Sequence, residues 1–455
     1  MEIRHRFSPS HFFILSIIFS LFLVFSILAL KPIKPFLPYL NFLLGTEKPT
    51  SYLILLGNDA ETRANGGFAG SYAKLIITNR KVQKQSPSSN NNLLFRIFRI
   101  TPTIDLSFQD IYVPNGQLQG YVAPPAPVQE AFQHGTWQLA NADWEPDFPT
   151  AATTIRWFME KGDEINPDNL IILNLTTIKK ILDVVGSFTV SEYNAQITPD
   201  NLYLFLQGKA EVNFFPGSTQ KKDALTAVGH SFKNAILNLP LRKKLKIAQI
   251  LYQDLQNQNI VANSTNQDFQ ALLEKKNFAG KLTSSTPDTF LMIEVNLGAN
   301  KANAYITRQT THKITFQNNQ TTHFLAVNFQ NSSPEANPNP PFHYGGDYKF
   351  FLRFYIPSNA QNIQIATPSS SIQPVKISMQ SPIITQKYDL TEIGLWQITP
   401  TQNQSTITLS YSLPVSAENY SLTILKQHGL VTSPQTINIG DKTYETKLEN
   451  DYSLN

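Results

Sequence analysis

Apolar residues follow three different patterns along this chain, and each pattern predicts a different structure. Residues 12–30 are uncharged and mostly apolar, close to the roughly 20 residues that a helix needs to cross a bilayer. Over residues 50–280, short apolar runs alternate with amphipathic segments, which predicts an α/β domain with a mixed sheet. Over residues 281–455, short β-like runs are separated by turn residues without helical segments, which is typical of an antiparallel β-sandwich.

The N-terminal apolar segment favours an uncleaved transmembrane helix over a cleavable signal peptide. A signal peptide has an apolar core of about 7 to 15 residues followed by a small-x-small site, whereas Ile27 and Leu28 occupy the positions before Ala29. Residues 1–11 then form a cytoplasmic tail. We therefore expect a single-pass protein of the cell membrane, with the bulk of the chain extracellular; cleavage stays open as the alternative.

The segment that follows, residues 31–49, is rich in proline and predicts a stalk, because closely spaced prolines resist a continuous helix. Further proline, at residues 123–127, predicts an extended linker. The α/β domain should contain strands over residues 51–56, 73–78, 99–106 and 169–175, and helices that begin near Asp147, Thr176, Thr198 and Leu239. The helix that begins at Thr176 should end at Val185, before Gly186. The β-sandwich strands are expected over residues 290–296, 304–310, 323–329, 348–356, 405–413 and 420–427.

Composition narrows the possible chemistry. The chain has 455 residues, no cysteine, and 37 basic against 33 acidic residues, for a net charge of +4. The absence of cysteine excludes disulfides, thiolate metal sites and a cysteine nucleophile. The small, dispersed charge excess argues against nucleic acid as a partner, since nucleic-acid binding normally needs a clustered basic face.

The most unusual local sequence is residues 57–71, GNDAETRANGGFAGS, which directly follows a predicted buried strand. Ligands often bind at the carboxyl ends of strands in α/β sheets. There Arg63 could bind a phosphate or carboxylate, and Asp59 or Glu61 could hold Mg²⁺. Asp59 and Arg63 are the candidate catalytic residues, and the candidate ligand-binding residues around them are Asn58, Glu61, Gly66, Gly67 and Ser71. The alternative is a buried arginine–carboxylate pair that braces a glycine-rich turn.

Two other groups of residues carry weaker signals. Trp137, Trp144 and Trp157 could stack on sugar rings, although packing in the core is the simpler interpretation. The basic run at residues 242–246 predicts the solvated face of an amphipathic helix, which an anionic wall polymer or a lipid surface could also use.

The segment RANGGFAGSY, residues 63–72, resembles the signature of an uncharacterised bacterial family, the domain-of-unknown-function family DUF4012. Further segments resemble this family in the same order: NADWEPDFPTAA at 141–152, NLGANKANAYITR at 296–308, YKFFLRFYIP at 348–357 and YSLTILKQHG at 420–429. The resemblance implies a protein anchored by one N-terminal helix. It implies no activity.

A remoter resemblance links the strand, the following Gly-Asn-Asp-x-x-x-Arg and residues 169–190 to LytR-CpsA-Psr phosphotransferases. It implies transfer of a glycan from a polyprenyl-pyrophosphate lipid to the cell wall, with Asp59 and Arg63 in the pocket and Mg²⁺ on the pyrophosphate. This chain departs from that family where further arginines are expected, because residues 209–235 offer only lysines as bases apart from His230. Lysine lacks the two-pronged geometry of arginine.

Two functions therefore stand side by side. The first is a non-catalytic module of the cell envelope that binds a cell-wall polymer or a protein. The second is a Mg²⁺-assisted phosphotransferase centred on Asp59 and Arg63. A concave site around Arg63 would favour the enzyme, whereas an Arg63 sealed in an ion pair would favour the binding module.

Overall fold

The computed structural model describes residues 34–79, 102–133, 135–212, 219–284, 286–336, 345–367, 381–430 and 433–454. The predicted cytoplasmic tail and transmembrane helix, residues 1–30, lie outside this described part. Within it, no helix is long and apolar enough to cross a membrane. The chain divides into two compact units, one of residues 1–50 and 76–104 and the other of residues 51–75 and 105–455.

In the first unit, the described part of the proline-rich segment forms two short helical pieces. They are the 3₁₀-helix η1 (Lys34–Tyr39), which contains Pro38, and the single-turn helix α2 (Leu40–Leu43). Proline supplies no amide hydrogen, so a longer continuous helix is not formed here. The Thr50 hydroxyl donates a hydrogen bond to the Phe42 carbonyl and ties α2 to the start of the first strand.

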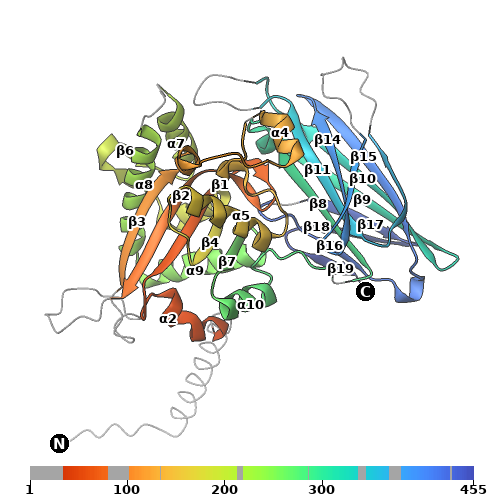
Figure 1. Cartoon of the computed structure of the whole chain (residues 1–455), viewed down its shortest axis with the longest axis horizontal. Coiled ribbons are helices and arrows are strands. Elements are labelled where there is room, and N and C mark those ends of the chain that lie inside the picture. Colours follow the sequence, from red (N-terminus) through yellow and green to blue (C-terminus); the bar gives the residue numbers. More distant parts are fainter. Residues whose placement is uncertain are drawn as a thin grey trace, which may run out of the picture. The chain divides into compact units, whose positions relative to one another are not determined.

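The second unit begins with a mixed five-stranded sheet, which confirms the predicted mixed α/β architecture (Figure 1). Its strands, in spatial order, are β3 (Pro102–Asp110), β2 (Gly66–Asn79), β1 (Thr50–Arg63), β4 (Asn169–Asn174) and β7 (Ile260–Ser264). β1 and β4 run parallel, whereas β4 and β7 run antiparallel. β4 pairs with only the first half of β1, since its last residue, Asn174, lies opposite Gly57.

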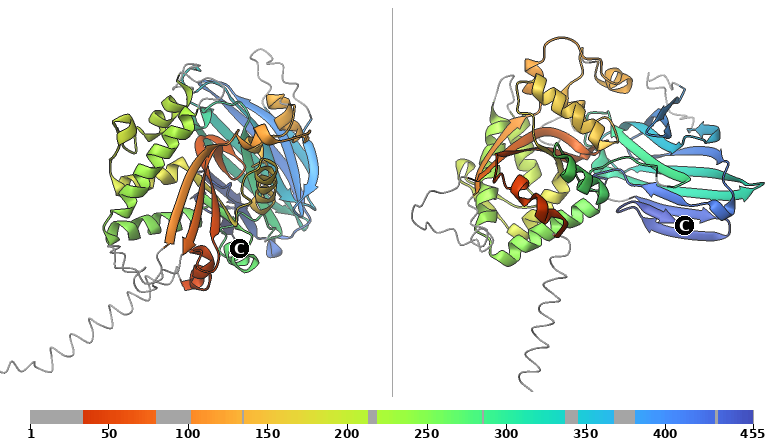
Figure 2. Two further views of the ribbon diagram at one scale, coloured as in Figure 1. Left: turned by 60° about the vertical axis from the view of Figure 1, so that its left-hand side comes forward. Right: turned by 60° about the horizontal axis from the view of Figure 1, so that its bottom comes forward.

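Helix α5 (Phe148–Lys161) packs its apolar face on this sheet. Ile155, Phe158 and Met159 share one buried core with Leu53 of β1 and Leu170 of β4. The other helices of this region are α4 (Ala126–Phe132), α6 (Leu175–Val185), α7 (Leu202–Glu211), α8 (Gln220–Leu237), α9 (Leu241–Gln256) and α10 (Gln267–Lys275). Short 3₁₀ turns η2 (Pro114–Gln117), η3 (Leu139–Asn141) and η4 (Ser191–Tyr193), and a two-stranded ribbon of β5 (Phe188–Val190) and β6 (Ala195–Ile197), connect them. Figure 2 shows the yellow-green helices gathered beside the sheet.

Local signals fixed several helix ends as predicted. Asp147 caps α5, because its carboxylate accepts the Thr150 amide at 3.0 Å. Gly186 ends α6 with a φ of 86°, a left-handed conformation that glycine adopts without strain. The linker predicted at residues 123–127 was wrong at its end: Ala126 and Pro127 form the first turn of α4, where a proline leaves no hydrogen bond unmade.

The rest of the second unit consists of two six-stranded, mainly antiparallel sheets. The first is ordered β12 (Gln361–Ala366), β15 (Asn403–Leu413), β10 (Gln320–Asn331), β9 (Ile306–Gln317), β17 (Pro434–Ile439), β18 (Lys442–Lys447). The second is ordered β13 (Ile383–Lys387), β14 (Leu390–Thr399), β11 (Tyr348–Pro357), β8 (Asp288–Asn296), β16 (Leu422–Leu425), β19 (Tyr452–Leu454). Each sheet also contains one parallel pair, β9 with β17 and β8 with β16, which the sequence did not predict. Two 3₁₀ turns, η5 (Ala302–Tyr305) and η6 (Ala417–Asn419), complete this part.

Strand β11 is buried on both of its faces. Phe350, Leu352 and Phe354 point into the apolar core that the two six-stranded sheets share. On the opposite face, Phe351 and Tyr355 belong to a second apolar cluster, which includes Trp144 and Val128 from the α/β region. A strand covered on both sides reads as a continuous apolar run, and this explains the sequence YKFFLRFYIP.

Candidate functional site

Residues 57–71 form the tip of a β-hairpin, so the predicted end of the first strand near residue 56 was wrong. β1 continues to Arg63, β2 begins at Gly66, and only Ala64 and Asn65 form the turn. The apolar run stops at Gly57 because β4, its apolar neighbour, also stops there. Beyond that point β1 has polar partners instead, and the sequence therefore looked like a loop.

The glycines of the hairpin allow close packing. A Cβ atom on Gly67 would lie 2.1 Å from the Asn58 carbonyl carbon, and one on Gly57 would lie 2.3 Å from Asn174 Oδ1. The Gly67 amide donates to the same Asn174 oxygen at 2.9 Å. A Cβ on Gly66 would lie 2.8 Å from Ile172. The Gly67 amide is thus used within the protein, and both glycines predicted to bind a ligand lie against neighbouring chain segments.

Arg63, the predicted phosphate-binding residue, is only 3% exposed. Its Nη2 pairs with Glu61 Oε1 at 3.0 Å, and its Nη1 donates to the main-chain carbonyls of Asn296, at 2.7 Å, and Thr62, at 3.2 Å. The guanidinium also stacks over Phe68, 4.7 Å from the ring centroid. Arg63 therefore has a structural role, because its buried positive charge is neutralised by a carboxylate and its guanidinium is hydrogen-bonded to main-chain carbonyls.

The cavity beside Arg63 is too small for a substrate. It also touches Gly67 and Asp143 and holds about 10 Å³. A volume of that size is just enough for one water molecule.

Asp59, in strand β1, caps the N-terminus of helix α6. Its Oδ2 accepts hydrogen bonds from the main-chain amide of Thr176, at 2.8 Å, and from the Thr176 hydroxyl. Thr176 lies in the first turn of α6, whose own N-cap residue, Asn174, makes no capping hydrogen bond. A carboxylate at this end of a helix satisfies a free amide and complements the helix dipole. Burial nevertheless raises the pKa of Asp59, and the Thr176 hydrogen bonds and the charges of Lys179 and Lys180 oppose that rise.

The surroundings of Asp59 do not fit the predicted Mg²⁺ site. Its Oδ1 is buried without a partner, which leaves one free ligand atom. However, the positive charges of Lys179 and Lys180 act on the same carboxylate, and positive charge opposes a cation. Across the described residues, no group of three or more acidic or histidine side chains could hold a metal.

The remaining candidate residues have local roles. Asn58 Oδ1 accepts the Ala60 amide at 3.1 Å, Glu61 pairs with Arg63, and Ser71 is buried within β2. Asp59 does not line the small cavity beside Arg63.

The other segments that carry the DUF4012 resemblance meet this hairpin. Asn65 at the turn donates to Asp143 twice, from its amide at 3.2 Å and from its side chain at 2.6 Å. Burial raises the pKa of Asp143 to about 6, although these hydrogen bonds and nearby arginines lower it. The Trp144 carbonyl, next in the chain, accepts a 2.7 Å hydrogen bond from Arg353 of β11.

The last of these segments closes the same network. Gln427 donates from Nε2 to the carbonyls of Arg63, at 2.9 Å, and Glu294, at 2.8 Å, and accepts the Glu294 amide at 2.9 Å. Asn303 Oδ1 accepts the Thr62 amide at 3.0 Å. The motifs thus converge on buried hydrogen bonds that join the hairpin to the two six-stranded sheets.

Two of the lysines that stand where further arginines were expected are engaged elsewhere. Lys221 pairs with Asp110 at 2.9 Å and donates to the Gly70 carbonyl at 2.6 Å. Lys209 lies over the ring of Tyr193, 4.8 Å from its centroid.

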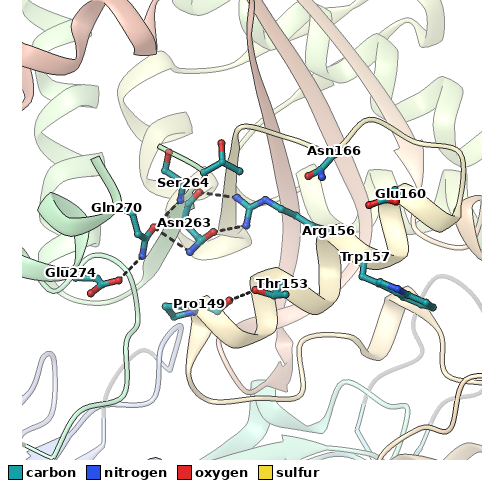
Figure 3. A pocket seen from close by; sticks show the side chains of 11 residues that line it. Pro149, Thr153, Arg156, Trp157, Glu160, Asn166, Asn263, Ser264, Gln270 and Glu274 are labelled. Carbon is teal, nitrogen blue, oxygen red and sulfur yellow. Dashed lines mark hydrogen bonds between the residues drawn. The ribbon is translucent and has the colours of Figure 1, made fainter. Parts of the chain in front are cut away.

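A different surface holds a cavity with a volume of about 520 Å³ (Figure 3). We call it the α5–α10 groove. It is lined by Pro149, Thr153, Arg156, Trp157, Glu160, Asn166, Asn263, Ser264, Thr265, Gln270 and Glu274. Its volume lies in the range of typical ligand pockets, about 300 to 1,000 Å³. Its indole, Trp157, is 39% exposed, whereas Trp144 is 8% exposed.

A chain of hydrogen bonds fixes the polar wall of this groove (Figure 3). Arg156 donates to the Asn263 side chain and to the Pro167 carbonyl, the latter at 3.1 Å. Asn263 donates to Gln270 at 3.1 Å, and Gln270 donates to Glu274 at 3.1 Å. Burial lowers the pKa of Arg156 to about 10, still above neutral pH, so Arg156 keeps its positive charge.

Sequence reasoning found Trp157 but missed the groove. Thr153, Trp157 and Glu160 are spaced so that they lie on one exposed side of α5, and this spacing could have indicated the α5 wall of the groove from the sequence. Asn263 and Gln270 belong to β7 and α10, which the sequence analysis did not predict.

Three solved structures resemble this chain distantly. A Legionella pneumophila protein described as nutrient-binding has 9% identity and a TM-score of 0.23, covering 33% of this chain and 54% of its own. Bacillus subtilis TagV has 11% identity and a TM-score of 0.29, covering 52% and 82%, and Listeria innocua Lin1025 has 12% and 0.26, covering 51% and 79%. The chain thus spans about half the length of the Legionella protein.

No curated protein is significantly similar to this sequence. Residues 47–210 match the model of the family described as "Protein of unknown function (DUF4012)", which confirms the predicted family resemblance over the region that contains the hairpin, Asp143 and the capped helix α6.

Proposed function

We propose that this protein is a non-catalytic binding protein of the cell envelope and that its α5–α10 groove binds a polyhydroxylated polymer. The observation that carries the proposal is the exposed indole of Trp157 on a groove of about 520 Å³ whose other wall is a fixed row of amide and charged groups.

The chemistry of the groove suits a sugar chain. Aromatic rings pack on the apolar faces of sugar rings, while side-chain amides, carboxylates and guanidinium groups exchange hydrogen bonds with hydroxyls. The hydrogen bonds among Arg156, Asn263 and Gln270 hold these groups in place before a ligand arrives. A wall ordered in advance loses little conformational entropy on binding.

The placement of the protein is part of the proposal. The apolar residues 12–30 support a single membrane anchor with the following chain outside the cell. We interpret the two six-stranded sheets, which share one apolar core, as a β-sandwich. The phosphotransferase alternative has less support, because Arg63 is already bound to Glu61 and Asn296 and the adjoining cavity holds about 10 Å³.

Calorimetric titration of the full chain with a short N-acetylglucosamine oligomer tests the groove. We expect saturable binding that Trp157→Ala weakens by about two- to tenfold, because an aromatic contact contributes roughly 0.5 to 1.5 kcal/mol. Tyr121→Ala is the matched control, since Tyr121 is 69% exposed and does not line the groove. Absence of binding to any neutral or anionic wall polysaccharide, or equal loss in both variants, would overturn the proposal.

The anchor has a separate test. Mass spectrometry of the protein recovered from bacterial membranes should find the peptide that contains Phe12. A soluble product that starts near Leu30 would instead show that the segment is a cleaved signal peptide.

A further inference from the structure

The start of helix α9 exposes leucines that have no apolar neighbour to cover them. Leu237, at the end of α8, is 50% exposed, and Leu241 and Leu245 of α9 are 49% and 55% exposed. A spacing of four places Leu241 and Leu245 on one side of the helix. Ile247 and Ile250, on the opposite side, are buried against α6 residues such as Ile181. The helix therefore has two apolar faces, and only one of them is used within the described protein.

Basic side chains surround this exposed face. Arg242 and Lys246 are exposed beside it, and Lys244 reaches back to donate a 2.7 Å hydrogen bond to the Leu237 carbonyl. Lys243 is also exposed, but it precedes Ile247 by four residues and therefore lies on the other side of the helix. No acidic residue occurs between residues 237 and 253. The nearest acid of α9, Asp254, is buried and bound to Lys180 and Thr177, so it does not offset these charges at the surface. On α6, which packs against α9, the exposed acid is Asp183, alongside the basic Lys179 and Lys180.

We propose that the first two turns of α9, together with Leu237, bind the surface of an anionic lipid bilayer. Leucine side chains would enter the boundary between headgroups and acyl chains, while the flexible basic chains reach lipid phosphates. An anionic polymer in water would use the positive charges but would leave the three leucines in water. The combination of both features on one face is what favours a lipid surface, and it is independent of the α5–α10 groove.

The cysteine-free chain makes a direct test possible, because a single introduced cysteine carries the only label. Ala248 is exposed and follows Leu245 by one helical turn. The full chain with Ala248→Cys, labelled with a polarity-sensitive fluorophore, is reconstituted into phosphatidylcholine vesicles with or without phosphatidylglycerol. We expect a blue shift, and quenching by nitroxide-bearing lipids, only when phosphatidylglycerol is present.

Substitutions separate the contributions of charge and apolar contact. Arg242→Gln with Lys246→Gln should lower the equilibrium constant for contact of α9 with the phosphatidylglycerol-containing bilayer, measured from the blue shift, by roughly fivefold per charge. Leu241→Ser with Leu245→Ser should abolish the quenching by nitroxide lipids. Lys275→Gln with Lys276→Gln on α10 removes the same charge elsewhere and should change nothing.

Each outcome bears on the proposal. Unshifted fluorescence with phosphatidylglycerol, or full quenching in the serine variant, would overturn it, the latter because the leucines would then play no part. Circular dichroism confirms that each variant is folded. Because binding of the sugar oligomer is measured on the same variants, failure at the bilayer is distinguishable from failure of the groove.

Discussion

The guanidinium of Arg63 donates a 2.7 Å hydrogen bond to the main-chain carbonyl of Asn296, a residue that lies 233 positions later in the chain. The two residues belong to different segments of the DUF4012 resemblance, and they meet inside the protein. Arg63 therefore has a role in holding β1 against β8, and this role can be measured as stability.

Arg63→Ala should lower the free energy of unfolding by about 3 to 5 kcal/mol, because it leaves Glu61 buried without its partner. Chemical denaturation monitored by tryptophan fluorescence measures this. Lys161→Ala, which removes an exposed ion pair with Glu160, is the control and should cost little. If Arg63→Ala were as stable as the wild type, the structural role of Arg63 would be contradicted, and Arg63 would again be a candidate ligand-binding residue.

Gly67→Ala should be severely destabilising, by more than about 2 kcal/mol, since its Cβ would lie 2.1 Å from main-chain atoms of Asn58 that cannot move independently. Gly116→Ala is the matched control, because a Cβ there meets nothing within 4 Å. If thermal denaturation finds the two variants equally stable, close packing does not explain the glycine pair.

Asp59→Ala should cost about 1 kcal/mol through loss of the cap on α6, whereas Asp59→Asn, which retains an acceptor for Thr176, should cost less. Hydrogen exchange of the first amides of α6 gives a local measurement. Equal protection of these amides in the wild type and in Asp59→Ala would contradict the capping role.

Lys426 predicts a pH effect on stability. Its side chain is 2% exposed, and burial lowers its pKa from 10.5 to about 7, partly offset by Asp451 and Asp254. The unfolded chain therefore binds this proton more tightly than the folded chain between about pH 7 and 10.5, so this group's contribution to stability rises across that window. Lys426→Met should remove the rise. The unfolding free energies of the wild type and of Lys426→Met are measured from pH 6 to about 10 and subtracted. Because both proteins contain the same tyrosines, which titrate at about pH 10 when unfolded, the difference reports the contribution of Lys426 alone. A difference that does not change with pH would contradict the prediction.

How much the sequence revealed depended on the range of the interactions. Asp147 and Gly186 act within one helical turn, and the ends of α5 and α6 were predicted correctly. The hairpin tip was not, because beyond Gly57 β1 no longer pairs with the apolar strand β4 and instead has distant polar partners such as Asn303 and Gln427. The predicted alternative for Arg63, a buried brace beside a turn, agrees with its contacts. The α5–α10 groove needed β7 and α10, whose short amphipathic patterns gave too weak a signal.

The hydrogen bond from Gln427 to the Arg63 carbonyl spans 364 residues. The hairpin near the start of the chain therefore cannot complete its polar core until nearly the whole chain has emerged from the ribosome. Until then, Arg63 and Glu61 must remain hydrated or rely on temporary partners, and folding of this region is bound to be slow and late. Nascent chains halted before residue 427 should consequently expose the hairpin to proteases, however well the five-stranded sheet around it has formed.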